Sequence, residues 1–331
     1  MFEFLKHLFP TDGDPVPGGD RRLVEVAIEA LVDRTDPRLR ALSDYRQRLA
    51  PAVEEAILHT RLVVARLQPP VELTRRAFAA DPLVHLLFAT AESIGEIAGR
   101  DPNVREFLAS PRHAGSATLF ALLLAERREK TVFGHGLEGG ILVRDIPQTM
   151  ISFTRHRLHA VAGSEAHALS LTGRIVFRQL IRHSLEHMRA RRRSIAAAAG
   201  TAMEEAPAVR PETHDDPFSR RPPAEDRSGR FAADAIADRK VRPPPTLEDY
   251  LDDAVAVMEA PARHLNHRQR TVKVDRMGIV RPSRNAAGDF DTITYWEATP
   301  DTGIGPMATV LVRIPVGEIA TDPLFPGDPV F

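Results

Sequence analysis

Apolar residues recur at helical spacing along most of the first 130 residues of the chain. Leu23, Ala27, Ala30 and Leu31 lie three or four positions apart, which is typical of a helix with one buried face. Similar patterns follow, separated by Pro, Gly and Asp. We therefore expect a helix that begins at Asp20 and further helices over residues 37–67, 72–79, 82–98, 101–109 and 115–130.

An Asp-Pro pair precedes three of these segments, at Asp36, Asp81 and Asp101. An Asp side chain at the residue before a helix accepts a hydrogen bond from a free N–H of the first turn. Pro at the first helical position loses no hydrogen bond there and fixes φ in the helical range. The three pairs therefore predict helix starts and not a chemical site.

The pattern changes after residue 131. Gly134, Gly136 and Gly139 fit the string G-x-G-x-x-G, and β-branched residues follow them. A dinucleotide site needs a strand before this string and a helix after it, whereas here we expect a helix before it and a strand after it. Glycine also suits a turn. The segment therefore predicts a turn with strands at about 140–145 and 149–155, separated by Pro147.

The clearest predicted helix covers residues 169–194, with Ser164 or Ser170 as its cap. Residues 199–245 form a contrasting segment that is rich in Pro and charge. From Pro207 to Pro245 it holds eight prolines and few large apolar residues, which predicts a flexible linker. Thr246, followed by Glu248 and Asp249, then predicts a new capped helix. Alternating segments at 271–281, 290–297 and 308–314 predict an antiparallel meander.

The predicted fold class is α+β. A mainly α-helical domain at 1–198 would contain a small β insertion near 132–156. The linker at 199–245 would lead to a small module at 246–331, built from one helix and the meander. A length of 331 residues is sufficient for two such domains.

Composition narrows the range of functions. Lys plus Arg is 44 and Asp plus Glu is 45, so nucleic-acid binding would have to depend on a local basic patch. The chain has no cysteine, which excludes disulfides, thiolate catalysis and Cys-ligated metals, and we expect a cytoplasmic protein. The apolar run at 117–125 is shorter than the roughly 20 residues of a membrane span, so none is predicted.

His183, Glu186 and His187 form the string H-x-x-E-H within the 169–194 helix. Residues four apart share a helix face, so both imidazoles could bind one zinc ion while Glu186 acts as a base. The order resembles that of the inverzincin metallopeptidases, which implies a zinc-dependent hydrolase. Arginines follow at 189 and 191–193, and their charge opposes binding of a doubly positive ion. We therefore keep the zinc-dependent hydrolase as the alternative prediction. The primary prediction, given below, includes neither a cofactor nor a catalytic residue.

The same helix has a strongly basic side. Against one acid, Glu186, it carries seven arginines, at 174, 178, 182, 189, 191, 192 and 193. A basic amphipathic helix can bind an acidic protein surface or phosphates. The acidic helix expected at 248–259 is an intramolecular candidate. We therefore predict a non-enzymatic binding or regulatory protein whose partner is another protein or its own C-terminal module, with nucleic acid as a further alternative. The predicted binding residues are Arg174, Arg178, Arg182, Arg189, Arg192 and Arg193.

Overall fold

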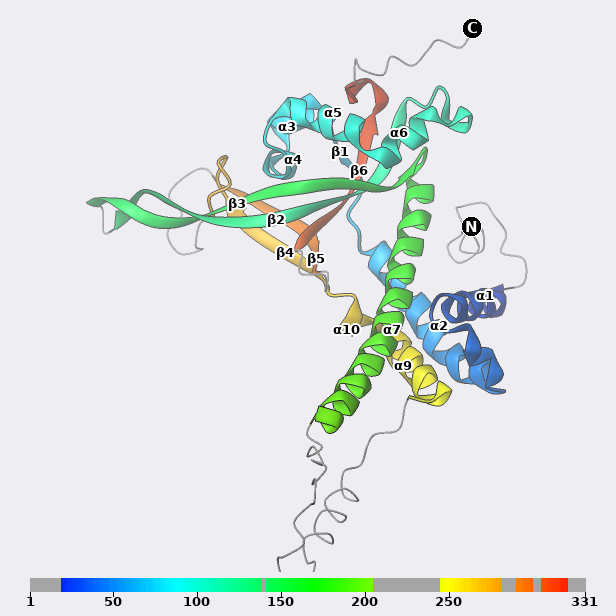
Figure 1. Ribbon diagram of the computed structural model, residues 1–331. Helices are drawn as coiled ribbons and strands as arrows, with labels where there is room; N and C mark the ends of the chain where they lie inside the picture. The colour runs from blue at the N-terminus through cyan, green and yellow to red at the C-terminus, as the bar shows by residue number, and fades with distance from the viewer. Residues whose placement is uncertain (1–18, 139–140, 205–244, 281–289, 300–304, 321–331) are drawn as a thin grey trace, which may run out of the picture.

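The computed structural model describes residues 19–138, 141–204, 245–280, 290–299 and 305–320, and it has the expected α+β architecture (Figure 1). A curled antiparallel sheet with short helices forms one part of the molecule. A cluster of longer helices forms the other part. The helix α7 (Glu165–Glu204) connects the two. Among the described residues no helix is both long and apolar enough to cross a membrane.

The main sheet path has the strand order β3-β2-β6-β5-β4, and the two-residue strand β1 also pairs with β6. Strands from the two halves of the chain therefore form one sheet, because β2 pairs directly with β6. The residues expected as a separate C-terminal module thus share a sheet with the N-terminal half. The strands are β1 (Val71–Glu72), β2 (Thr118–Glu138), β3 (Ile141–Ala162), β4 (His267–Val274), β5 (Asp291–Ala298) and β6 (Met307–Pro315).

The prediction of a helix over 115–130 is wrong, because residues 118–130 belong to β2. Ala, Leu, Glu, Arg and Lys all favour helices, but strand pairing on both sides and burial override that preference. Leu119 and Leu123 are buried in the core under one face of the sheet. Phe120 packs on the other face, beside Ala168 of α7. A strand covered on both faces has a continuous apolar run, which its sequence alone does not distinguish from a buried helix.

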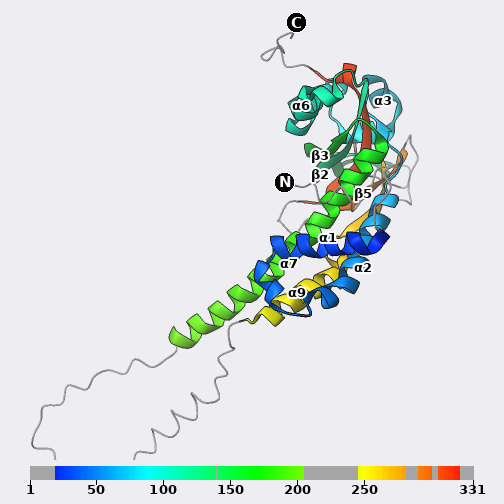
Figure 2. The same ribbon diagram turned by 90° about the vertical axis from the view of Figure 1, so that its right-hand side faces the viewer.

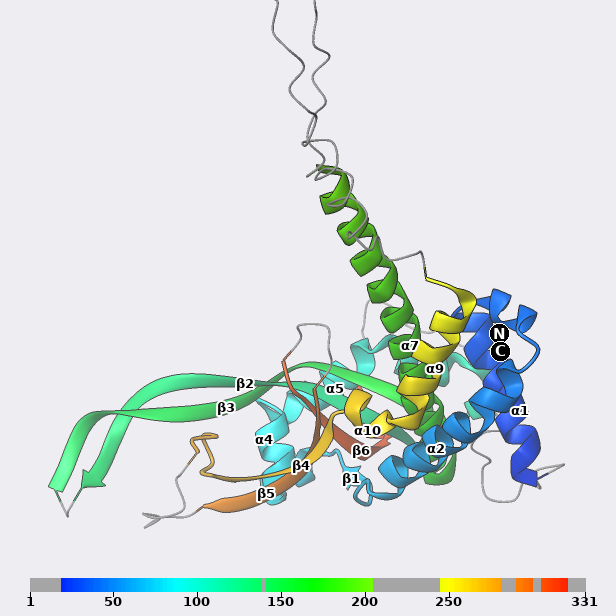
Figure 3. The same cartoon turned by 90° about the horizontal axis from the view of Figure 1, so that it is seen from below.

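The strands expected at 140–145 and 149–155 are parts of a single longer strand, β3. Pro147 does not separate them, since it pairs with Phe133 within the β2–β3 ladder. The ladder has three register shifts, and β3 residues with positive φ lie at them: Asp145, Arg155 and Ala160. Such bulges bend a strand and increase its twist. Beyond Glu126, where the β6 pairing ends, the β2–β3 hairpin projects from the sheet as an arm (Figure 3).

The segment after β4 crosses to β3 and brings the two sides of the curled sheet together. The N–H of Ile151 donates to the carbonyl of Gly278, and the N–H of Val280 donates to the carbonyl of Thr149. Gly278 has a φ of +75°, and a Cβ there would lie 2.5 Å from the Ile151 oxygen. Both the conformation and the close contact require glycine.

Short helices cover one face of the sheet and share its core: α3 (Arg75–Ala80), α4 (Pro82–Leu87), α5 (Ala91–Arg100) and α6 (Pro102–Ala109). The predicted Asp-Pro caps are confirmed. Asp81 and Asp101 accept N–H bonds at α4 and α6, and Asp36 does so at the 3-10 helix η2 (Pro37–Ala41). The expected 82–98 helix is interrupted at Phe88, and a capping box at Thr90 starts α5.

The helical cluster consists of α1 (Gly19–Arg34), α2 (Tyr45–Ala65), part of α7 and α9 (Leu247–Glu259) around a second core. The expected 37–67 helix is divided into η2 and α2, while Pro51 lies inside α2. Thr246 caps α9 as predicted. The short helices η3 (Pro111–His113), α10 (Pro261–His264) and η4 (Val316–Glu318) complete the described elements.

The predicted 169–194 helix is confirmed as part of α7, which is about 60 Å long at 1.5 Å per residue. Residues 199–204, expected in the linker, continue this helix. The rest of the predicted linker, 205–244, lies outside the described residues. Figure 2 shows α7 passing α1, α2 and α9 and continuing beyond them.

Candidate functional site

One face of α7 is fixed by the helical core. Phe177, Leu180, Ile181 and Met188 are buried there, packed with residues of α1, α2 and α9. Their spacing of three, one and seven positions keeps them on one side of the helix. This packing determines which side chains of the predicted basic helix face outward.

Arg191 and Arg192 are held by neighbouring elements. Arg191 forms two hydrogen bonds to Asp253 of α9, at 2.7 and 2.6 Å. The Nε of Arg192 donates to the Tyr250 hydroxyl at 2.6 Å, while its Nη2 lies 3.3 Å from Asp36. The hydrogen bonds that Arg191 donates to Asp253 raise the pKa of Arg191, although burial opposes the shift. The acidic helix α9 thus neutralises part of the arginine series.

The other predicted binding residues divide into two groups. Arg174 is partly buried near the sheet and donates to Ser170 at 3.2 Å, and burial lowers its pKa. By contrast, Arg178, Arg182, Arg189 and Arg193 are exposed. At 100° per residue these four side chains fall within about 60° of the helix circumference. Arg182 is 3.6 Å from Glu186, one helical turn further along α7.

The H-x-x-E-H residues do not share one environment. His183 is buried, His187 is exposed, and Nδ1 of His183 is 3.6 Å from the Glu186 carboxylate. The structure adds His264 of α10, whose ring centroid lies 5.7 Å from that of His183 and 5.1 Å from that of His187. Within the described residues, no group of three or more His, Asp or Glu side chains could hold a metal ion. The structure thus places a third imidazole, that of His264, near the two predicted zinc ligands, but the described residues do not form a set of zinc ligands.

The glycine string lies at the tip of the β2–β3 arm. Gly134 pairs with Ile146 and Gly136 with Val143, so strands flank the turn on both sides. Gly139 falls outside the described residues. Gly134 and Gly136 are therefore strand residues of β2, the expected turn at Gly139 is not tested by the described residues, and the described element that follows is the strand β3, not a helix that could bind phosphate.

A buried ion cluster lies within the sheet. Glu297 of β5 is fully buried and accepts hydrogen bonds from Arg127 of β2 at 2.7 Å and from Arg268 of β4 at 3.0 Å. Burial alone would raise the pKa of Glu297, but the hydrogen bonds from Arg268 and Arg127 outweigh it and hold the pKa below its ordinary value. Because Arg127, Arg268 and Glu297 come from β2, β4 and β5, the cluster joins strands from the two halves of the chain.

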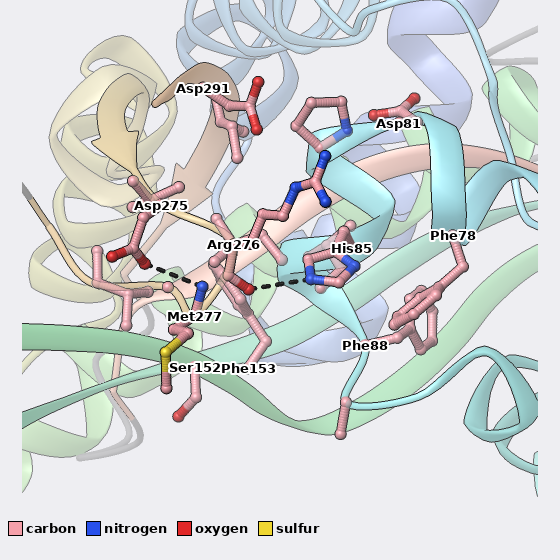
Figure 4. A pocket seen from close by; sticks show the side chains of 18 of the residues that line it. Phe78, Asp81, His85, Phe88, Ser152, Phe153, Asp275, Arg276, Met277 and Asp291 are labelled. Atoms are coloured by element: carbon pink, nitrogen blue, oxygen red, sulfur yellow. Dashed lines mark hydrogen bonds between the residues drawn. The ribbon is translucent and has the colours of Figure 1, made fainter. Parts of the chain in front are cut away.

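A pocket of about 580 Å³ opens between the curled sheet and the helices α3 and α4 (Figure 4). Its apolar lining includes Phe78, Phe88 and Phe153. The polar side chains that line it are Asp81, His85, Ser152, Asp275, Arg276 and Asp291. These residues come from α3 and α4, from the middle of β3, from the turn after β4 and from the start of β5.

Sequence reasoning missed both the ion cluster and the pocket. A signal for the first existed, because Ile293, Tyr295 and Glu297 alternate along β5 and therefore share its inward face. A carboxylate at an inward position requires a cationic partner. For the pocket, nothing in the 271–281 segment indicated that residues 275–280 pack against β3.

Comparison of the chain with protein-family models, with curated proteins and with solved structures finds no significant match.

Proposed function

We propose that this chain is a non-enzymatic binding protein that uses the exposed arginine stripe of α7 to bind an acidic protein surface. The stripe consists of Arg182, Arg189 and Arg193, with Arg178 at its sheet-proximal end. The observation that carries the proposal is the exposure of these arginines on one arc of α7, while α9 engages Arg191 and Arg192 on another.

The positions of the charges support a surface role. Arg189 and Arg193 are one helical turn apart and both are exposed, whereas Arg191 between them bonds to α9. Neither Arg189 nor Arg193 has an ion pair or a hydrogen bond with another described side chain. Arginine presents several donors in a planar fork, which suits carboxylates on a partner. A helix packed along its opposite face holds these donors in a fixed row, which lowers the entropy cost of binding.

The test measures binding of a fluorescent poly-glutamate peptide to the full-length protein by anisotropy at low and at physiological salt. Reversing the stripe, with Arg182→Glu, Arg189→Glu and Arg193→Glu together, should weaken binding at least tenfold, since three attractions become repulsions. A matched control changes three exposed arginines elsewhere, Arg76→Glu, Arg105→Glu and Arg112→Glu. This control has the same net charge and should retain most of the affinity.

Equal weakening in both triple variants would show that net charge alone drives binding, and it would contradict the proposal. A DNA duplex serves as the competing probe. If it binds more tightly than the peptide, with a steep salt dependence that the stripe variant removes, the nucleic-acid alternative replaces the proposal.

A further inference from the structure

The pocket between α4 and β3 has rigid walls. Oδ1 of Asp275 accepts the N–H groups of Met277 and Ile279 at 2.9 and 3.0 Å, which fixes the turn after β4. Nε2 of His85 lies 3.0 Å from the carbonyl oxygen of Arg276 and joins this turn to α4. Since a carbonyl only accepts, the imidazole donates there. The pocket is therefore formed before any ligand enters, as small-molecule sites usually are.

The size and lining of the pocket suit a small ligand with an apolar part. A volume of about 580 Å³ lies within the usual range of ligand pockets, roughly 300–1,000 Å³. Leu86, Phe88, Phe153 and Ile293 are buried residues of its lining. Phe78 contacts the ring of His85, with 4.7 Å between the ring centroids, so the apolar surface continues along one wall.

Charged side chains of both signs line the pocket and are available to bind a ligand. In the described part of the chain, the guanidinium of Arg276 and the carboxylate of Asp291 have no hydrogen bond or ion pair with another side chain. Asp81 uses one oxygen to cap α4 at 2.8 Å, which leaves the other as an acceptor. In the view of Figure 4 the Arg276 guanidinium lies between the carboxylates of Asp81 and Asp291.

We propose that this pocket binds a small zwitterion of the α-amino acid type with a large apolar side chain. The Arg276 guanidinium would pair with the ligand carboxylate, as planar two-point donors do. Asp291 and the free oxygen of Asp81 would accept from the ligand ammonium group, and the apolar side chain would lie on the phenylalanine lining. A ligand with one charge would leave an opposite charge of the site without a partner.

The test uses isothermal titration calorimetry of the full-length protein with L-phenylalanine and L-leucine. Phenethylamine, which lacks the carboxylate, and 3-phenylpropionate, which lacks the ammonium group, are the matched probes. At least one of the two amino acids should bind. Each single-charge analogue should bind about tenfold or more weakly than L-phenylalanine, because a charged group of the site then lacks its hydrogen-bond partner.

Two variants separate the contributions. Arg276→Gln should weaken L-phenylalanine binding about tenfold, while phenethylamine binding stays unchanged. Asp291→Asn should also weaken L-phenylalanine binding about tenfold, while 3-phenylpropionate binding stays unchanged. The control Arg263→Gln makes the same chemical change on α10, away from the pocket, and should bind like the wild type. Thermal melting of each variant should be unchanged, since neither side chain supports the fold.

Three outcomes would overturn the proposal. One is the absence of binding by both amino acids at millimolar concentration. Another is an analogue that binds as tightly as L-phenylalanine, which would define a site for a simple organic cation or anion. The third is wild-type binding of L-phenylalanine by both the Arg276→Gln and Asp291→Asn variants.

Discussion

Two arginine–carboxylate clusters join distant parts of the chain, and they differ mainly in burial. In the sheet, Arg127 and Glu297 are 8% and 0% exposed, and Arg268 closes the cluster from β4. In the helical part, Arg191 and Asp253 are 30% and 11% exposed and connect α7 to α9. Nearby, Arg48 pairs with Glu248 across α2 and α9, with exposures of 33% and 56%.

The comparison shows that similar hydrogen-bond lengths do not imply similar energies. A buried pair has lost its hydration, so removal of one partner leaves a charge that nothing compensates. At an exposed pair, water and salt replace the lost partner. The free energy of unfolding should therefore fall steeply on mutation in the sheet, moderately at Arg191–Asp253 and slightly at Arg48.

The largest effect is expected for Glu297→Gln. This change removes the buried carboxylate that pairs with Arg127, whose guanidinium keeps only the half-exposed Glu129 as an ionic partner, and should reduce the free energy of unfolding by about 3 kcal/mol. Chemical denaturation followed by circular dichroism measures the loss. The double variant Glu297→Gln, Arg127→Met should recover part of the stability, because the buried guanidinium that has lost its buried partner is removed as well. A loss below about 0.5 kcal/mol, the size expected of an exposed pair, would contradict the importance of burial.

The same carboxylate predicts a pH dependence. Because the folded-state pKa of Glu297 is depressed below 4.5, its contribution to stability is fully present above that pH. The contribution is then lost as the pH falls through the folded-state pKa. The difference between wild type and Glu297→Gln should thus be constant near neutral pH and shrink below about pH 4.5 in denaturation experiments. If the difference in the free energy of unfolding between wild type and Glu297→Gln instead grows as the pH falls, the prediction is wrong.

Local signals predicted local features well. The caps at Asp36, Asp81, Asp101 and Thr246 depend on residues one to three positions away, so the sequence suffices to predict them. The failure at 115–130 has a different cause. Leu119–Ala125 suits a helix or a doubly covered strand equally, and the choice is made by pairing with β6, nearly 190 residues later in the chain.

The candidate sites differ in the same way: features set by nearby residues could be predicted, and features set by long-range contacts could not. The outward position of Arg189 and Arg193 follows from the helical period once Leu180 and Met188 are taken as buried. The pocket could not be predicted, because Asp81, Arg276 and Asp291 come together only through the contact of the 275–280 segment with α4 and β3. That contact depends on Gly278 and on the curl of the sheet.

An intermediate loss is expected for Asp253→Asn. The amide keeps one acceptor oxygen but loses the negative charge and the second acceptor that bind the Arg191 guanidinium. The free energy of unfolding should therefore fall by about 1.5 kcal/mol. A double-mutant cycle with Arg191→Gln isolates the pair from other effects of each change. A coupling energy near zero would indicate that Asp253 matters only through its packing.

The smallest effect is expected at Arg48. Its guanidinium bonds to Glu248 at 2.6 Å and also pairs with Asp252, yet all three side chains reach solvent. Arg48→Gln should therefore cost about 0.5 kcal/mol or less at physiological salt, and the difference from wild type should vanish in concentrated sodium chloride. Denaturation of both proteins at two salt concentrations measures this. A loss as large as that of Glu297→Gln, and insensitive to salt, would mean that the number of pairing partners and not burial determines the energy of these clusters.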